Sequence, residues 1–325
     1  MTFWNRRQML IMAAVAPLAT SRRAIAAAYP DRPVRIVIPY TAGGVAETLI
    51  RLLATKIEPR LGQKLVIEAK PGAAGNIGTL DVAYATPDGY TLLVAATNNY
   101  VINQYMTKMP VDPLTALAPV AKVADVPLVL FTNKQVPFRT FSEMIDFARA
   151  HPGKLSYGVP SLGTVNHLLM ERLKQTAGLD ITAIPYRGSP QATLALLSND
   201  IQLYPIGLAA GIGSMRDGKI AALAVATEQR LPVLPQVPTI QESGFPGFVA
   251  SNWWGMGAPK GTPEAVLEIW HDAVIEALKD PAIAKRLDEL GMVPRFETRA
   301  QLTSGLAAEA TLWREVVTRG KLSAQ

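Results

Sequence analysis

VRIVIPYTAGG, residues 34–44, reads as a buried β-strand that runs into a glycine loop. The apolar-rich residues 34–38 are followed by a proline and then by two glycines, and a helical pattern begins directly after them. A loop that follows a strand and opens a helix directs free backbone N–H groups and the positive end of the helix dipole outward. The stretch therefore predicts an α/β fold with an anion-holding loop near the start of the chain.

The first 28 residues have the three parts of an export signal. Arg6 and Arg7 form a basic start, residues 8–21 are uncharged and mostly apolar, and small residues occupy 26–28. The apolar run is shorter than the roughly 20 residues that span a bilayer, and it lacks the polar face of a surface helix. We expect export to the periplasm with cleavage after about Ala28. The arginine pair resembles a twin-arginine signal, and general secretion is the alternative route.

The charge and the cysteine count exclude several classes of function. Cleavage after Ala28 removes four arginines and no acidic residue, so the net charge falls from +6 to +2. The remaining chain has no basic tract with interleaved aromatics and no cysteine, which excludes zinc fingers, thiol catalysis and disulfides. The three histidines, His151, His167 and His271, are too few and too scattered for a metal site. We expect no nucleic-acid partner, no metal and no cofactor.

Beyond residue 44, β-branched apolar runs alternate with segments of helical period. A helix with apolar positions at 46, 49, 50, 53 and 57 stops before Gly62. Further strands are expected at 64–68, 90–95, 126–131, 155–158, 181–185, 201–204 and 220–226, and helices at 76–85, 141–150, 165–177 and 191–197. This alternation predicts parallel-rich sheets with helices on both faces, and ligands bind at the carboxyl ends of such strands. The chain without its signal is long enough for two lobes.

A series of short motifs resembles the substrate-binding proteins of tripartite tricarboxylate transporters, the TctC-like Bug family. The motifs are residues 34–44 with Glu47, then 61–63, 71–78, 87–93, 152–155, 163–168, 185–188, 223–225, 234–239, Trp253 and 258–263. They span the whole chain after the signal in order, which makes the resemblance specific. It implies a type II periplasmic binding fold, with two α/β lobes joined by crossing strands and a ligand cleft between them. It places lobe 1 at 29–127 plus 228–325 and lobe 2 at 128–227.

The resemblance also implies a function. We expect a solute receptor, not an enzyme, that captures a small organic carboxylate and delivers it to a membrane permease of the tripartite tricarboxylate type, and we expect a monomer. In the family two loops grip one ligand carboxylate, partly through ordered waters. Here they are Tyr40-Thr41-Ala42-Gly43-Gly44 and Ser161-Leu162-Gly163-Thr164. Their glycines let the backbone approach an anion, and their hydroxyls can donate hydrogen bonds to it.

Further ligand contacts are expected around the same cleft: Glu47, Asn76, Thr97, Asn98, His167, Arg187 and Tyr204. Glu47 stands where the family usually has aspartate and adds one methylene toward the cleft. Asn76 follows a tight glycine loop and can help to close on the ligand. Arg187 is either a bidentate partner of a second carboxylate or a solvated arginine on a turn. The pair Trp253-Trp254 either packs beneath the cleft or stacks on an aromatic ligand.

One departure from the family pattern bears on ligand charge. Ala195 falls where the family motif normally supplies an aspartate. Loss of that carboxylate would disfavour amino or other cationic ligands and relatively favour plain or aromatic carboxylates.

An exported enzyme on the same fold is the alternative function. His167 and Glu171 lie four residues apart on one predicted helix, where they form either a base with its orienting carboxylate or a structural contact. The effector domain of a transcriptional regulator is disfavoured, because an export signal occupies the place of a DNA-binding domain. Residues 213–220 nearly match a phosphate-binding loop, but Ile220 replaces the hydroxyl residue that holds magnesium, so we interpret them as a turn.

Overall fold

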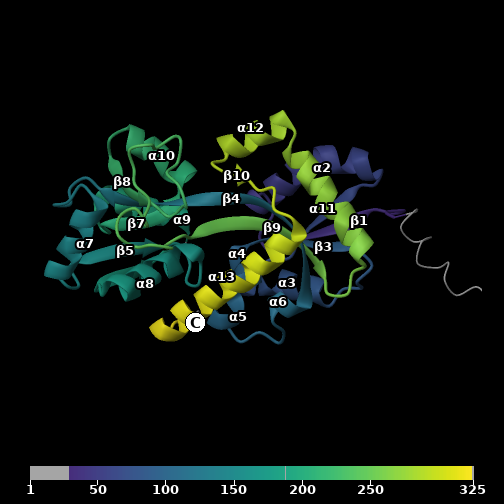
Figure 1. Ribbon diagram of the computed structural model, residues 1–325, viewed down its shortest axis with the longest axis horizontal. Helices are drawn as coiled ribbons and strands as arrows, with labels where there is room; N and C mark the ends of the chain where they lie inside the picture. Colours follow the sequence, from purple (N-terminus) through teal and green to yellow (C-terminus); the bar gives the residue numbers. More distant parts are fainter. Residues whose placement is uncertain (1–28, 187, 324–325) are drawn as a thin grey trace, which may run out of the picture.

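The computed structural model describes residues 29–186 and 188–323, so the predicted signal and Arg187 lie outside the described residues. The chain forms two α/β lobes joined by two long strands, β4 (Leu117–Asn133) and β9 (Ser251–Pro259) (Figure 1). The strands follow the order β2-β1-β3-β9-β4-β7-β5-β6, with β10 and β8 pairing to β4. Within the described part of the chain, no helix combines the length and the apolar character needed to cross a bilayer.

Each lobe has its own strands and helices. Lobe 1 contains β1 (Val34–Ile38), β2 (Leu65–Ala69), β3 (Thr91–Ala96), β10 (Val293–Pro294), the short helix η1 (Ala73–Gly75), and the helices α2 (Val45–Leu61), α3 (Asn76–Ala83), α4 (Thr97–Val101), α5 (Asn103–Met106), α6 (Pro113–Ala116), α11 (Glu264–Leu278), α12 (Pro281–Glu289) and α13 (Arg299–Gly320). Lobe 2 contains β5 (Leu155–Val159), β6 (Ile181–Pro185), β7 (Leu203–Gly207), β8 (Ile220–Val225), and the helices α7 (Phe141–Ala150), α8 (Val165–Ala177), α9 (Ser189–Ser198) and α10 (Leu208–Arg216).

The first helix shows how the sequence pattern produces the local structure. The buried positions of α2 are Ala46, Leu49, Ile50, Leu53 and Ile57, which is the predicted apolar face. The helix ends at Gly62, whose φ of 70° is the left-handed conformation that glycine adopts without a steric penalty. The prediction of this helix and of its end is confirmed.

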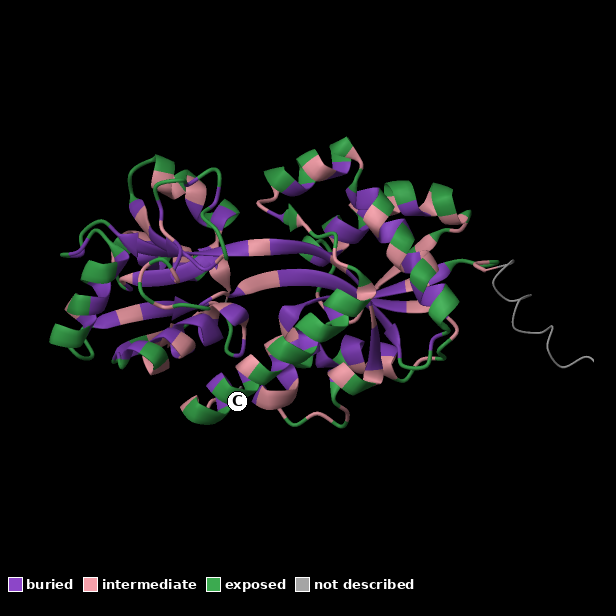
Figure 2. Cartoon of the chain, in the orientation of Figure 1, coloured by how far each residue is buried: buried purple, intermediate pink, exposed green. Residues whose placement is uncertain are grey.

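Helices cover both faces of the sheet in lobe 1. Val34, Ile36 and Ile38 of β1 belong to the core beneath α2 and α11, whereas Val37 belongs to the core beneath α3 and α13. Figure 2 shows the resulting layers, with buried strands between helices whose outer surfaces are exposed. The predicted arrangement of helices on both faces is confirmed.

The strand β4 changes its neighbours where it passes between the lobes. It pairs antiparallel with β9 as far as Pro127, which lies opposite Ser251, and from Leu128 onward it pairs with β7 and β8. The sequence predicted only residues 126–131 of this strand, and it did not predict β9. The segment that resembled a phosphate-binding loop ends helix α10 and then forms the turn before β8, so the interpretation as a turn holds for its second half.

The pairing pattern orients the carboxyl ends of the parallel strands toward the junction of the lobes. In lobe 1, β1 and β3 run parallel, and the end of β3 at Ala96 lies opposite Trp254 of β9, near the point where β9 enters the lobe. In lobe 2, β5 and β7 run parallel, and the end of β7 at Gly207 lies opposite Leu128 of β4. The two groups of strands therefore direct their carboxyl ends at each other.

Candidate functional site

Two loops open onto the space between the lobes. Loop 1, residues 39–44, leads from β1 into α2, and loop 2, residues 160–164, leads from β5 into α8. Both follow carboxyl ends of parallel strands, which is where ligands bind in α/β sheets. Loop 2 also contacts lobe 1, because a methyl group added to Gly163 would lie 3.3 Å from the Met106 Cγ of α5. The sequence indicated both loops but not the contact with Met106.

The two loops have the same backbone construction, so that residues 41–47 match residues 161–167 position by position. Gly43 and Gly163 have φ angles of 80° and 77°, in the left-handed region that favours glycine. The next residues, Gly44 and Thr164, are the N-caps of α2 and α8; Gly44 has no side chain, and the Thr164 side chain does not cap its helix. The first backbone N–H groups of both helices thus lack side-chain caps at the position where an anion would bind.

In both loops the glycine N–H donates to the side chain four residues later. The Gly43 N–H donates to Glu47 Oε2 over 2.8 Å, and the Gly163 N–H donates to His167 Nδ1 over 3.3 Å. Thr164 instead donates its hydroxyl to the Ser161 carbonyl oxygen over 2.8 Å. The loops are therefore held by contacts within themselves.

Glu47 is a charged acceptor on the first turn of α2, beside loop 1. Its Oε1 accepts a hydrogen bond of 2.8 Å from Arg51 Nε, while its Oε2 is on Gly43. The hydrogen bond from Gly43 and then the one from Arg51 lower the pKa of the Glu47 carboxyl. Glu47 therefore turns back onto its own loop, whereas the sequence predicted that it extends toward the cleft.

His167 is a neutral, buried acceptor beneath loop 2. Burial lowers its pKa and Lys174 adds to this, although Glu171 opposes both. The Glu171 carboxylate accepts hydrogen bonds from the Tyr157 hydroxyl at 2.6 Å and from Lys174 Nζ at 2.7 Å. His167 and Glu171 thus have separate partners. Of the two interpretations of this pair, a base with its orienting carboxylate or a structural contact, the geometry agrees with the structural contact.

A buried polar network supports loop 1 from below. The Tyr40 hydroxyl accepts from the Ala96 N–H over 3.1 Å and donates to Asn99 Oδ1. Asn99 in turn donates to the Thr79 hydroxyl, and it is fully buried. The Tyr40 ring also packs edge-on against Trp254. Sequence reasoning missed Asn99, although a run of polar residues directly after a predicted strand was a usable signal.

The remaining predicted contacts from lobe 1 are engaged within the fold. Asn76 donates to the Thr107 hydroxyl over 3.1 Å and accepts from Asn103 over 2.6 Å. The buried Thr97 hydroxyl is joined to the backbone of Trp253, and Asn98 donates to Asn103. These side chains connect the start of α3, the helices α4 and α5 and the crossing strand β9.

Two residues predicted from lobe 2 lie in its core. Tyr204 is fully buried among the side chains that contact α9, and burial raises the pKa of its phenol. Ala195 lies in the same core cluster. A carboxylate at position 195 would therefore enter the lobe 2 core, so the predicted link between Ala195 and the charge of the ligand is wrong.

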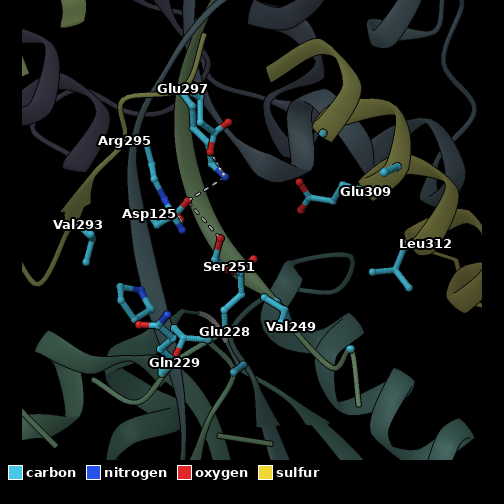
Figure 3. A pocket seen from close by; sticks show the side chains of 18 of the residues that line it. Asp125, Glu228, Gln229, Val249, Ser251, Val293, Arg295, Glu297, Glu309 and Leu312 are labelled. Carbon is cyan, nitrogen blue, oxygen red and sulfur yellow. Dashed lines mark hydrogen bonds and ion pairs between the residues drawn. The ribbon is translucent and has the colours of Figure 1, made fainter. Parts of the chain in front are cut away.

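A separate cavity of about 780 Å³ lies beside the crossing strands (Figure 3). Its charged lining residues are Lys122, Asp125, Glu228, Arg295, Glu297 and Glu309. Trp253 donates its indole N–H to Glu309, while the next residue of β9, Trp254, contacts Tyr40 of loop 1. Because successive side chains of a strand point to opposite faces, this cavity and loop 1 lie on opposite faces of β9.

The charges of this cavity suit a carboxylate poorly. Its lining carries four acidic side chains and two basic ones, and both basic groups are paired with Asp125. A bound carboxylate would meet more negative than positive charge there. Among the described residues no group of three or more histidines, aspartates or glutamates is arranged to hold a metal ion. The two loops remain the better candidate site for an anion.

Comparisons with known proteins agree with this geometry. A family model described as the tripartite tricarboxylate transporter family receptor matches residues 49–320. Protein BugT of Bordetella pertussis is 34% identical over 89% of this chain and 89% of its own length. The structure of R. palustris Rpa4515 with adipate is 33% identical, covers 91% of this chain and 99% of that chain, and has a TM-score of 0.77. The periplasmic binding protein BugD is 32% identical, with a TM-score of 0.73 over 91% of this chain and all of that one. The fold is that of a two-lobed periplasmic binding protein.

Proposed function

The chain belongs to the tripartite tricarboxylate transporter receptor family, and on that premise we propose that it captures a small organic carboxylate between its lobes and delivers it to a membrane permease of the tripartite tricarboxylate type. The observation that carries the proposal is the pair of loops at facing strand ends, each of which opens a helix with an uncapped N-terminus. A relative of this chain was solved with adipate, a carboxylate.

The energetics favour a site that uses both loops together. One helix N-terminus contributes about 0.3–1 kcal/mol at an exposed site and up to about 2 kcal/mol when partly buried. Micromolar affinity requires about 8 kcal/mol. We therefore propose that ligand binding draws the lobes together until both loops contact the same carboxylate, and that opening releases it at the permease.

We propose that the protein works in the periplasm as a monomer, after cleavage of the signal at about Ala28, with lobes at 29–127 plus 228–325 and 128–227. Tyr29, the first residue after the proposed cleavage position, is held within lobe 1, since its hydroxyl donates to the Gly89 carbonyl oxygen and accepts from the Trp270 indole N–H.

We further propose that it is not an enzyme, although an exported enzyme that uses His167 and Glu171 is the alternative. His167 Nδ1 accepts the Gly163 N–H, and the Glu171 carboxylate is occupied by Tyr157 and Lys174. Neither group is therefore arranged as a base with its orienting carboxylate.

A thermal-shift screen with adipate, malate and benzoate tests the proposal. A ligand that binds only the folded state stabilises it by about 2.7 kcal/mol at a concentration 100 times Kd, and this stabilisation raises the melting temperature. Mass spectrometry of the same mixtures should recover each acid unchanged. Turnover that disappears in His167→Ala would show that the enzyme alternative is correct.

A matched pair of variants tests the place of binding. Gly43 and Gly62 flank the same helix, both have positive φ, and neither has a neighbour within 4 Å of an added Cβ. Gly43→Val and Gly62→Val should therefore be similarly strained, but only Gly43→Val should lose the thermal shift. Equal retention of binding in both variants would refute the role of loop 1.

A further inference from the structure

One backbone donor of loop 1 is already occupied by a carboxylate of the chain itself. Glu47 Oε2 accepts the Gly43 N–H over 2.8 Å, and the Glu47 side chain exposes only 16% of its surface because it lies back against loop 1. A ligand carboxylate bound at loop 1 would approach the same N–H group. A single N–H group oriented toward one acceptor cannot serve both, and two carboxylates at this distance repel each other.

Arg51 fixes Glu47 in this competing position. Its Nε donates to Glu47 Oε1 over 2.8 Å, and its Nη2 lies 2.6 Å from the same oxygen. The pair is spaced four residues apart on the first turns of α2, so both side chains lie on one face of the helix. Loop 1 is thus neutralised from within: the chain supplies an anion at the helix N-terminus and a cation that holds it there.

Loop 2 has no such competitor. The matching acceptor of its glycine N–H is the His167 ring, which is buried and exposes 5% of its surface. A neutral imidazole acceptor adds no negative charge at the helix N-terminus. The two otherwise equivalent loops therefore differ in one property, the charge of the group that satisfies the glycine N–H.

We propose that Glu47 is an internal competitor of the ligand carboxylate at loop 1, and that it sets both affinity and selectivity by charge. This inference rests on the proposed function. The ligand must displace the Glu47 carboxylate from Gly43, after which Glu47 stays paired with Arg51 at the mouth of the site. Negative charge left on the bound ligand near the mouth then meets Glu47, so the site selects against ligands that carry additional carboxylates close to the bound one.

Glu47→Gln tests this proposal. The amide keeps the length and one acceptor oxygen of glutamate but carries no charge. We expect Glu47→Gln to bind adipate, malate and benzoate about five- to tenfold more tightly than the unaltered protein by isothermal titration calorimetry. The gain should be largest for malate, whose two carboxylates are closest together. In a crystal structure with bound benzoate, the Glu47 carboxylate of the unaltered protein should have left the Gly43 N–H.

Glu58→Gln is the matched control. Glu58 lies on the same helix, accepts the Leu65 N–H over 2.9 Å and pairs with Lys64, so it repeats the contacts of Glu47 at the far end of α2. Its substitution changes the net charge by the same amount and should leave all three affinities unchanged. Equal gains in both variants, or an unchanged or weaker affinity in Glu47→Gln, would overturn the proposal while leaving the receptor function intact. Absence of binding by every variant would overturn the receptor function itself.

Discussion

Loop 1 and loop 2 have the same backbone conformation but differ in the side chain that accepts the glycine N–H. Each places a glycine with positive φ before a helix N-cap, and each gives the glycine N–H to the side chain four residues on. In loop 1 that acceptor is an ionised carboxylate paired with an arginine at the surface, and in loop 2 it is a buried imidazole. A repeated backbone conformation therefore does not imply a repeated role. In loop 2 the acceptor of the glycine N–H is uncharged and buried, whereas in loop 1 it is a carboxylate whose charge a ligand would meet.

The largest effect on ligand affinity should come from Gly163→Val, which disrupts the conformation of loop 2. Its φ of 77° costs a non-glycine residue about 1–2 kcal/mol, and an added Cβ lies 3.3 Å from Met106 Cγ. We expect carboxylate affinity to fall by at least about 100-fold, or about 2.7 kcal/mol. Gly178→Val, at the other end of α8 and with nothing within 4 Å, should be strained without losing affinity. Calorimetry on both variants decides whether affinity is lost because of backbone strain in general or because of the position of Gly163 in loop 2.

The next effect should come from His167→Ala, which removes the neutral acceptor. The Gly163 N–H would be left buried without a partner, so we expect a loss of about 1–3 kcal/mol in the free energy of unfolding, measured in urea. His167→Gln is the control, because loop 1 shows that a side chain of this length reaches the glycine N–H four residues earlier. If His167→Gln unfolds as easily as His167→Ala, the hydrogen bond to Gly163 is not what His167 contributes.

Gly43→Ala should lower the free energy of unfolding by less, since loop 1 has open space around its glycine. Nothing lies within 4 Å of an added Cβ, so only the backbone strain of about 1 kcal/mol remains. Gly163→Ala should cost more because Met106 must shift. Urea unfolding of the two alanine variants compares the loops directly, and equal costs would mean that the contact between loop 2 and lobe 1 is not closely packed.

The smallest effect should appear in the dependence of stability on pH. The pKa of His167 is lowered by burial, so its contribution is present above the unfolded value of about 6.5 and is lost as the pH falls through the folded value. The pKa of Glu47 is lowered by the Gly43 hydrogen bond, so loop 1 loses its contact only at more acidic pH. Loop 2 should therefore weaken first. The difference in unfolding free energy between the unaltered protein and His167→Gln should shrink below pH 6.5, and a constant difference would contradict this order.

The sequence predicted those parts of the fold whose residues have a one-sided pattern. The helix α2 has one buried stripe, and α8 was predicted with its observed bounds. The strand β9 was missed because residues 253–259 are all buried, so no alternation of apolar and polar residues marks them. The first half of β4 contains Pro119 and Lys122, which obscured a strand that is 17 residues long.

The places of the two loops in the fold were predictable, but their internal contacts were not. Glycines after predicted strands identified both loops, because few other residues adopt positive φ. Whether Glu47 points toward the ligand or back to Gly43 depends on side-chain rotamers and on Arg51, which a linear pattern does not encode. Tyr204 was predicted as a ligand contact, yet its side chain lies in the core of lobe 2.

The contact between Tyr29 and Trp270 joins positions 241 residues apart along the chain. Lobe 2 draws its strands β5 to β8 from one continuous segment, whereas lobe 1 is assembled from both ends of the chain. Closing a longer loop costs more conformational entropy, and contacts between distant residues slow folding. Lobe 2 should thus acquire its structure early, and lobe 1, with the apolar strand β1, should remain incomplete until the segment that contains Trp270 is available to pack against it.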